Sequence, residues 1–301
     1  MTFQKITLID SCNLTSQVLE QIAQLSIAPI SIYNDFPATD EEILRRIGDS
    51  DCILVSWHTR VNAEVIQAST NLKYIGMCCS LYDEKAANVD IVQARKQGIV
   101  VKGVRDYGDD GTLEFIFAEL IYLMKGLGHL QWQTETRELR GKTMGIIGMG
   151  TLGTMVARTA RHFGMKVYYY NRSRKYELEE EGFGFLALNE LMAVCDVISL
   201  HLPKNSIVLT EAEFRNKKHN SILVNTSIGL TFDKEAFLNW ISADQSSYAI
   251  FDRVAVGEHL EEFSKYPNII LSEKSSGFTL EAKARLSEKV LENIQSYLAS
   301  I

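Results

Sequence analysis

Short apolar runs alternate with amphipathic stretches along the first hundred residues. The runs have the length of buried strands, and the stretches between them carry apolar residues at helical spacing. The predicted strands are 6–9, 27–33, 52–57, 74–78 and 99–101. The predicted helices are 15–25, 40–47, 62–69 and 90–97. Strands that alternate with helices in this way predict βαβ units and a parallel sheet.

A second series of the same kind follows a long predicted helix at 109–127. Its predicted strands are 143–147, 166–170, 196–202, 221–224, 247–251 and 268–271. The closing segment, 279–299, carries one apolar stripe and is predicted to be helical. No Pro/Gly/Ser-rich linker separates the two series, so we expect two α/β domains joined by structured chain.

Composition and charge narrow the class of protein. The chain has 301 residues, of which 46% are hydrophobic and 23% charged, and a formal net charge of −7; these values are typical of soluble globular proteins. The acidic balance argues against nucleic acid or an anionic membrane as the main partner. We expect a cytoplasmic protein, because there is no signal-peptide pattern at Met1 and the five cysteines are sparse and odd in number. No group of residues has the spacing of a metal site, so no metal is expected.

The strongest local motif is GMGTLG at 148–153. It follows the apolar strand at 143–147 directly and opens a predicted helix, which is the context that a dinucleotide-binding fingerprint requires. In that reading Gly148 permits the tight turn, Gly150 lets the backbone approach a pyrophosphate, and Gly153 lets helix and strand pack closely. Thr151 and Leu152 then belong to the helix N-terminus, whose free N–H groups face the phosphates. The alternative is a glycine-rich turn without a ligand.

The residues after the next strand bear on the choice of cofactor. NAD sites usually place an acid there to bind the ribose 2′-hydroxyl. This chain has Asn171, Arg172, Ser173 and Arg174 instead. Guanidinium groups bind a 2′-phosphate well, so NADP is favoured over NAD. The alternative is that both arginines are solvated surface charges and that selectivity is loose.

Several further segments together resemble one protein family. In chain order they are LRGKT at 139–143, DVISLHLP at 196–203, ILVNTSIG at 222–229, the aspartate at Asp252, and SEKSSGFT at 272–279. Their order and content are similar to those of the D-isomer-specific 2-hydroxyacid dehydrogenases. The resemblance implies a Rossmann dinucleotide-binding domain, residues 104–275, inserted into a smaller flavodoxin-like α/β substrate domain, residues 1–103 and 276–301.

The resemblance also implies contacts and partners. The positions that it places beside the cofactor are His201, Leu202, Pro203, Thr226, Ser227 and Asp252. It implies a small-molecule substrate, anionic in this family, and a homodimer formed near the helix at 109–127.

The positions that carry catalysis in that family are changed. The family uses an arginine to hold the substrate, a histidine to move a proton, and a glutamate beside that histidine. The corresponding residues here are Ile228, Lys274 and Gly257, with Glu258 one position further on. The family's glycine-rich substrate loop is replaced by 78–85, CCSLYDEK.

Two interpretations of these changes stay open. In the first, the protein is an atypical NAD(P)-dependent oxidoreductase in which Lys274 donates the proton or anchors the substrate, and Glu258 pairs with it or belongs to a solvated acidic face. His58, at the end of a predicted strand, is a third candidate catalytic group, or else a loop histidine with a satisfied hydrogen bond. In the second interpretation, the protein binds the cofactor without turnover, as a sensor or an interaction partner.

Overall fold

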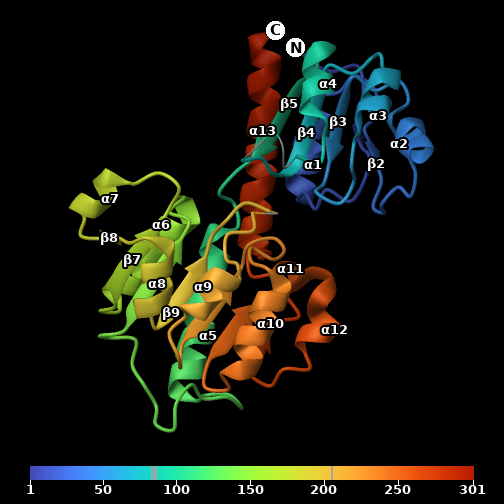
Figure 1. The fold of residues 1–301 in the computed structure, drawn as a ribbon. Coiled ribbons are helices and arrows are strands. Elements are labelled where there is room, and N and C mark those ends of the chain that lie inside the picture. The colour runs from blue at the N-terminus through green and yellow to red at the C-terminus, as the bar shows by residue number, and fades with distance from the viewer. Residues whose placement is uncertain (83, 85–86, 205) are drawn as a thin grey trace. The chain divides into compact units, whose positions relative to one another are not determined.

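The computed structural model describes residues 1–82, 84, 87–204 and 206–301. The chain divides into two compact units. Unit 1 consists of residues 1–107 and 279–301, and unit 2 of residues 108–278. Each unit is built on one parallel sheet (Figure 1), so the chain has the predicted α/β fold.

Unit 1 contains a sheet with the strand order β2-β1-β3-β4-β5, in which every pair is parallel. This is the flavodoxin-like order. The strands are β1 (Ile6–Leu8), β2 (Ser31–Ile32), β3 (Cys52–Val55), β4 (Tyr74–Ser80) and β5 (Val100–Val104). The helices are α1 (Ser16–Ala23), α2 (Asp40–Ile47), α3 (Ala63–Ala68), α4 (Ile91–Lys96) and α13 (Leu280–Ser300).

The helix α13 returns to unit 1 from the far end of the chain. It lies against β4 and β5 and against α1 (Figure 1). Five members of its predicted apolar stripe are buried in the same core cluster as Ile6, Leu54 and Tyr74: Leu286, Val290, Leu291, Ile294 and Leu298. The sixth, Leu280 in the first turn, is exposed, contrary to the prediction. Thr279 caps its first turn by accepting a hydrogen bond from Ala282 N at 3.0 Å. Unit 1 is thus completed by a segment that follows all of unit 2 in sequence.

Unit 2 contains a parallel sheet with the order β12-β11-β10-β9-β6-β7-β8. Its strands are β6 (Thr143–Ile147), β7 (Lys166–Tyr170), β8 (Gly184–Phe185), β9 (Val197–Leu200), β10 (Ile222–Asn225), β11 (Tyr248–Phe251) and β12 (Ile269–Leu271). Its helices are α5 (Asp109–Lys125), α6 (Thr151–His162), α7 (Tyr176–Glu180), α8 (Leu188–Val194), α9 (Glu211–Arg215), α10 (Lys234–Ala243), α11 (Arg253–Val256), the 3₁₀ turn η2 (Gly257–His259) and α12 (Leu260–Phe263). The strand order reverses between β6 and β9, which makes a switch point where ligands bind in open α/β sheets.

The second strand of unit 1 is shorter than predicted. The apolar run at 27–33 predicts one continuous strand, but β2 contains only Ser31 and Ile32. Pro29 cannot donate to a ladder, which explains why regular pairing starts after it. Ile27 and Ala28 bond instead to the backbone oxygens of Phe3 and Gln4.

Two global properties bear on the sequence predictions. All five cysteines are buried and none forms a disulfide. Within the described ranges, no helix combines the length and the apolar character that crossing a membrane requires.

Candidate dinucleotide site

The candidate site lies at the carboxyl edge of the unit 2 sheet. Gly148 follows β6, His201 follows β9, Thr226 follows β10 and Asp252 follows β11. Since parallel strands present their carboxyl ends at one edge, the topology brings these residues, predicted from separate motifs, to the same edge of unit 2.

The glycine loop between β6 and α6 is closely packed on one side and open on the other. Gly148 has a φ of +101°, and a Cβ there would lie 2.1 Å from the backbone oxygen of His201. A Cβ on Gly153 would lie 2.1 Å from the oxygen of Gly148. Apart from the adjoining chain, no heavy atom of the described residues lies within 4 Å of a Cβ built on Gly150. Gly150 is the N-cap of α6, and no side chain in the described part of the protein caps the helix there. The loop therefore leaves open, at the positive end of α6, the space that a pyrophosphate needs.

A cavity of about 490 Å³ adjoins this loop. It is lined by Met149, Gly150, Thr151, Thr154, Met155, Arg158, Lys175, Glu177 and Leu178. The sequence predicted Gly150 and Thr151 as cofactor-binding residues but not the other seven residues of this lining. Helical spacing from Thr151 places Thr154, Met155 and Arg158 on one face of α6, and this signal could have identified them.

The residues at the end of β7 differ in whether the protein already holds their side chains. Asn171 holds the glycine loop, since its Oδ1 accepts a hydrogen bond from Met149 N at 3.3 Å and its Nδ2 donates to Ser173 O at 3.0 Å. Arg172 is exposed, and no ion pair holds it among the residues that the structure describes. Arg174 forms a bidentate ion pair with Glu179, whose carboxylate also accepts a hydrogen bond from the Tyr169 hydroxyl at 2.7 Å. The guanidinium of Arg174 is therefore already neutralised within the protein, unlike the free charge that the sequence predicted.

Two buried polar atoms at the carboxyl ends of β9 and β10 have no hydrogen-bond partner in the described part of the chain. His201 Nε2 lies 2.9 Å from Ser199 Oγ, but its Nδ1 is unpartnered. Thr226 Oγ1 is also unpartnered. Burial lowers the pKa of His201 to about 3, so the imidazole is neutral at physiological pH. A bound polar ligand would satisfy both atoms.

Three other predicted contact residues have different surroundings. Ser227 is buried, and its hydroxyl accepts from Leu202 N at 3.0 Å and donates to Leu200 O at 3.2 Å. It joins the ends of β9 and β10. Leu202 is half-buried, with Cδ2 3.3 Å from the Cβ position of Gly148, and Pro203 is exposed.

Asp252 has internal partners for both carboxylate oxygens. Its Oδ1 accepts from Ala255 N at 2.9 Å, which caps α11. Its Oδ2 accepts from N and Oγ of Ser276, at 2.8 and 2.7 Å. Burial raises the pKa of this carboxyl, while the hydrogen bonds from Ser276 and Ala255 oppose the rise. Contact between Asp252 and the cofactor stays a prediction.

The residues at the family's catalytic positions lie after β10, β11 and β12. Lys274 is exposed; its oxygen accepts from Arg253 N at 3.1 Å and its N donates to Ser272 Oγ, also at 3.1 Å. Glu258 is exposed and forms no ion pair with Lys274 in the described ranges, so the suggested pairing is wrong for this structure. Ile228 is 43% exposed, and Gly257 has a φ of +55°.

The remaining candidate residues lie in unit 1. His58 follows β3, with its ring 3.7 Å from the ring of Trp57 and 4.4 Å from that of Phe36. Burial lowers the pKa of His58, and the nearby charge of Asp10 opposes this effect. In the replaced substrate loop at 78–85, Cys78 and Cys79 are buried, and positions 83 and 85 lie outside the described residues.

Comparison with known proteins identifies the family to which this chain is similar. A family model described as "D-isomer specific 2-hydroxyacid dehydrogenase, NAD binding domain" matches residues 120–273, slightly more than half of the chain. A glyoxylate reductase of Korarchaeum cryptofilum is 28% identical, over 88% of this chain and 84% of the relative. A hydroxypyruvate reductase of Blautia hydrogenotrophica is 26% identical, over 98% and 97%.

Solved structures show the same fold. An acyclic imino acid reductase in complex with NADPH and D-Arg superposes with a TM-score of 0.83, at 29% identity over 98% of this chain and 97% of that one. An NAD⁺-bound 3-phosphoglycerate dehydrogenase of Entamoeba histolytica shares the fold at a TM-score of 0.80, with 21% identity over 99% of this chain and 96% of that one. On the family model, the glycine fingerprint and the two sheets, this chain belongs to the D-isomer-specific 2-hydroxyacid dehydrogenase family.

Proposed function

We propose that the protein is an NADP(H)-dependent oxidoreductase that transfers hydride between the cofactor and a small, anionic carbonyl or hydroxy compound. The observation that carries the proposal is the carboxyl edge of unit 2. There, an open glycine loop at a helix N-terminus lies on the same edge as two buried polar atoms, His201 Nδ1 and Thr226 Oγ1, which have no hydrogen-bond partner among the described residues. Polar atoms buried without partners cost free energy unless a ligand satisfies them.

The residues present fit a nicotinamide dinucleotide. The N-terminus of α6 at Gly150 would hold the pyrophosphate. Arg172, which is free of ion pairs in the described chain, and Lys175, which lines the adjoining cavity, would hold a 2′-phosphate. Arg174 is left out because Glu179 already neutralises it. When bound, the nicotinamide would supply or accept the hydride.

Lys274 is the residue to which we assign the proton transfer or the anchoring of the substrate. Reduction of a carbonyl adds hydride to carbon and a proton to oxygen, so some group must provide that proton. The apolar side chain of Ile228 can neither donate a proton nor bind an anion. The hydrogen bonds that the backbone of Lys274 forms with Arg253 and Ser272 fix its Cα. Its exposed ammonium, which forms no ion pair within the described ranges, would meet an anionic substrate.

The roles of unit 1 and of a second copy follow from the family. We propose that unit 1 is the substrate domain and that the protein is a homodimer. The relatives named above reduce glyoxylate and hydroxypyruvate, as their names state. Small 2-oxo acids are therefore the first substrates to test.

A second candidate substrate is a 2-imino acid, on one specific observation. The histidine and glutamate of the family's proton-transfer pair are replaced by Lys274 and Gly257. A protonated imine carries its proton on nitrogen before hydride arrives, so its reduction needs no proton donor. The similarity to an imino acid reductase points in the same direction.

The test is a turnover assay with NADPH. Glyoxylate, hydroxypyruvate and pyruvate are each supplied alone and then with ammonia or a primary amine, and NADPH oxidation is followed by absorbance. Oxidation with the oxo acid alone supports the carbonyl substrate, and oxidation only with amine supports the imine. NADPH binding without oxidation of any compound would favour the non-catalytic alternative and contradict the proposal.

A pair of variants then tests Lys274. Lys274→Ala should lower kcat/KM for the oxo acid about a hundredfold, the usual contribution of one positioned acid or base. Lys265→Ala, which removes another exposed lysine of unit 2, is the matched control and should leave turnover unchanged. Equal rates for both variants would show that Lys274 has no part in the reaction.

A further inference from the structure

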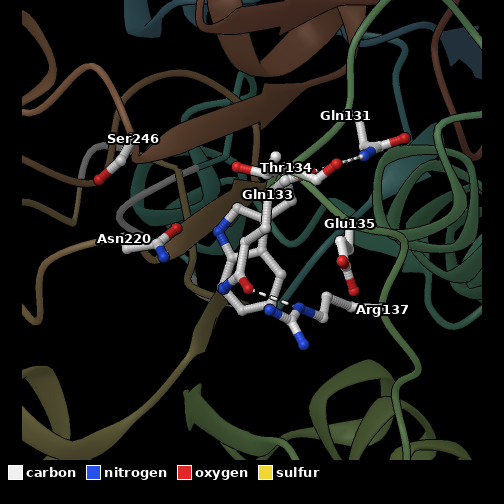
Figure 2. Close-up of a pocket in the computed structure, with 8 residues that line it drawn as sticks. Gln131, Gln133, Thr134, Glu135, Arg137, Asn220 and Ser246 are labelled. Carbon is white, nitrogen blue, oxygen red and sulfur yellow. Dashed lines mark hydrogen bonds between the residues drawn. The ribbon is translucent and has the colours of Figure 1, made fainter.

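Unit 2 carries a second cavity, of about 740 Å³, at the amino edge of its sheet. It is lined by Gln131, Trp132, Gln133, Thr134, Glu135, Arg137, Asn220 and Ser246 (Figure 2). Asn220 precedes β10 and Ser246 precedes β11, while the other residues belong to the segment between α5 and β6. The candidate dinucleotide site follows the opposite ends of these strands, so the two sites are separate.

The segment that forms one wall is held in a defined conformation. Gln131 Nε2 donates to the oxygens of Gln133 and Thr134, at 2.6 and 2.9 Å, and the oxygen of Gln131 accepts from Tyr248 Oη at 3.1 Å. Arg137 Nε donates to Gln133 Oε1 at 2.6 Å (Figure 2). These bonds order the wall without using the outer nitrogens of Arg137.

The opposite wall is organised by Asp244. Its Oδ2 accepts from Asn220 N at 3.0 Å, and its Oδ1 accepts from Ser246 N and Oγ, at 3.1 and 2.5 Å. Asn220 has a φ of +53°, which asparagine tolerates better than most residues. The Asp244 carboxylate thus fixes both residues of this wall, and it holds the backbone of Asn220 at a positive φ.

Two buried polar atoms of the cavity have no hydrogen-bond partner in the described chain, and two charged side chains that line it form no ion pair there. Trp132 is 4% exposed, and its Nε1 is buried without an acceptor. Asn220 Oδ1 is buried without a donor. Glu135 and Arg137, both exposed, form no ion pair within the described residues. The cavity therefore offers an unused donor, an unused acceptor and one charge of each sign.

We propose that this cavity binds a free amino acid. The carboxylate would accept hydrogen bonds from the Arg137 guanidinium and Trp132 Nε1, and the ammonium would donate to Asn220 Oδ1 and the Glu135 carboxylate. Glu135 would repel a simple anion and Arg137 would repel a simple cation. A zwitterion, which carries both charges, therefore matches the wall better than either. The indole of Trp132 adds an apolar surface, and the volume admits a long side chain.

Tryptophan fluorescence gives a direct test. The chain has three tryptophans, so Trp57→Phe with Trp240→Phe leaves Trp132 as the only one. This double variant is titrated at millimolar concentrations with glycine, leucine, glutamate, lysine and arginine, each separately. At least one should change the emission in a saturable manner. An N-acetyl, N′-methylamide derivative of the same amino acid, which lacks both charges, should give no such change.

Two substitutions in this background test the assigned contacts. Arg137→Gln and Asn220→Gly should each weaken binding about tenfold, as the loss of a charge-assisted hydrogen bond does. Glycine suits the positive φ at 220, so that variant removes the carboxamide without straining the backbone. The control is Arg140→Gln, which loses the same charge outside the cavity and should bind as before.

Three results would each overturn the proposal. The first is the absence of a saturable change with any of the five amino acids. The second is equal binding by Arg137→Gln, Asn220→Gly and the control. The third is an emission change that follows protein concentration and not amino acid concentration, because a second copy of the chain would then fill the cavity.

Discussion

The carboxylate of Asp252 accepts two hydrogen bonds from Ser276, at 2.8 Å from N and 2.7 Å from Oγ. These bonds tie the end of β11 to the segment after β12, which contains Lys274. Asp252→Ala leaves the donors of Ser276 and Ala255 without their acceptor. We expect it to lower the free energy of unfolding by about 3 kcal/mol, measured by urea denaturation. Ser276→Ala, which removes only the hydroxyl, should cost about 1 kcal/mol; an equal loss in both variants would contradict this account.

Alanine at two glycines of the fingerprint should separate folding from cofactor binding. At Gly150 no described residue beyond the adjoining chain lies within 4 Å of the new Cβ, so Gly150→Ala should keep the wild-type Tm while binding NADPH at least about tenfold more weakly. At Gly148 the new Cβ meets the oxygen of His201, and the φ is positive, so Gly148→Ala should lower the Tm itself. Thermal melts and NADPH fluorescence titrations measure the two effects. Unchanged NADPH affinity in Gly150→Ala would place the pyrophosphate elsewhere.

The two arginines after β7 should differ in their effect on cofactor choice. Arg172→Gln removes a charge that no acid neutralises in the described chain, so it should weaken NADPH binding about tenfold and leave NADH binding unchanged. Arg174→Gln mainly breaks the ion pair with Glu179 and should change neither affinity. Fluorescence titration of both cofactors checks this. Tighter binding of NADH than NADPH by the wild type would remove the basis for a 2′-phosphate site.

The buried His201 should make stability depend on pH. Its pKa is lowered from 6.5 to about 3 in the folded state, so between these values the unfolded chain binds a proton that the folded chain does not. This contribution to stability is present above pH 6.5 and is lost as the pH falls toward 3, with a slope of up to about 1.4 kcal/mol per unit. Urea denaturation from pH 7 to pH 4 should show a shallower loss for His201→Gln than for wild type. His129→Gln, which changes an exposed histidine, should follow the wild-type curve.

The sequence patterns predicted the fold class and the position of the cofactor loop, for physical reasons. Buried parallel strands read as short apolar runs, so β3, β6 and β7 could be located closely. The strand predicted at 27–33 was too long, because Pro29 interrupts the pairing of β2 with β1 but does not interrupt the run of apolar residues. The short strand β8, of two residues, is too brief to produce a period.

The candidate site was less predictable than the loop, because side-chain partners depend on geometry. Arg174 has the same charge as Arg172 in the sequence, and only the structure shows that Glu179 neutralises it. Asn220 Oδ1, which has no partner in the described part of the protein, owes its position to Asp244, a residue of a later segment that holds the backbone of Asn220. The family has a histidine where this chain has Lys274. The resemblance could therefore identify the position as a catalytic one, but it could not assign a role to a lysine there.

The return of α13 to unit 1 separates the order of synthesis from the order in which the two units can finish folding. Every residue of unit 2 is made before Leu286, Val290 and Ile294, which complete the core of unit 1. Until then the faces of β4 and β5 that α13 covers are open to water. Unit 1, whose synthesis starts first, is therefore the last unit that can complete its core. Its apolar surface is the one that needs protection in the nascent chain.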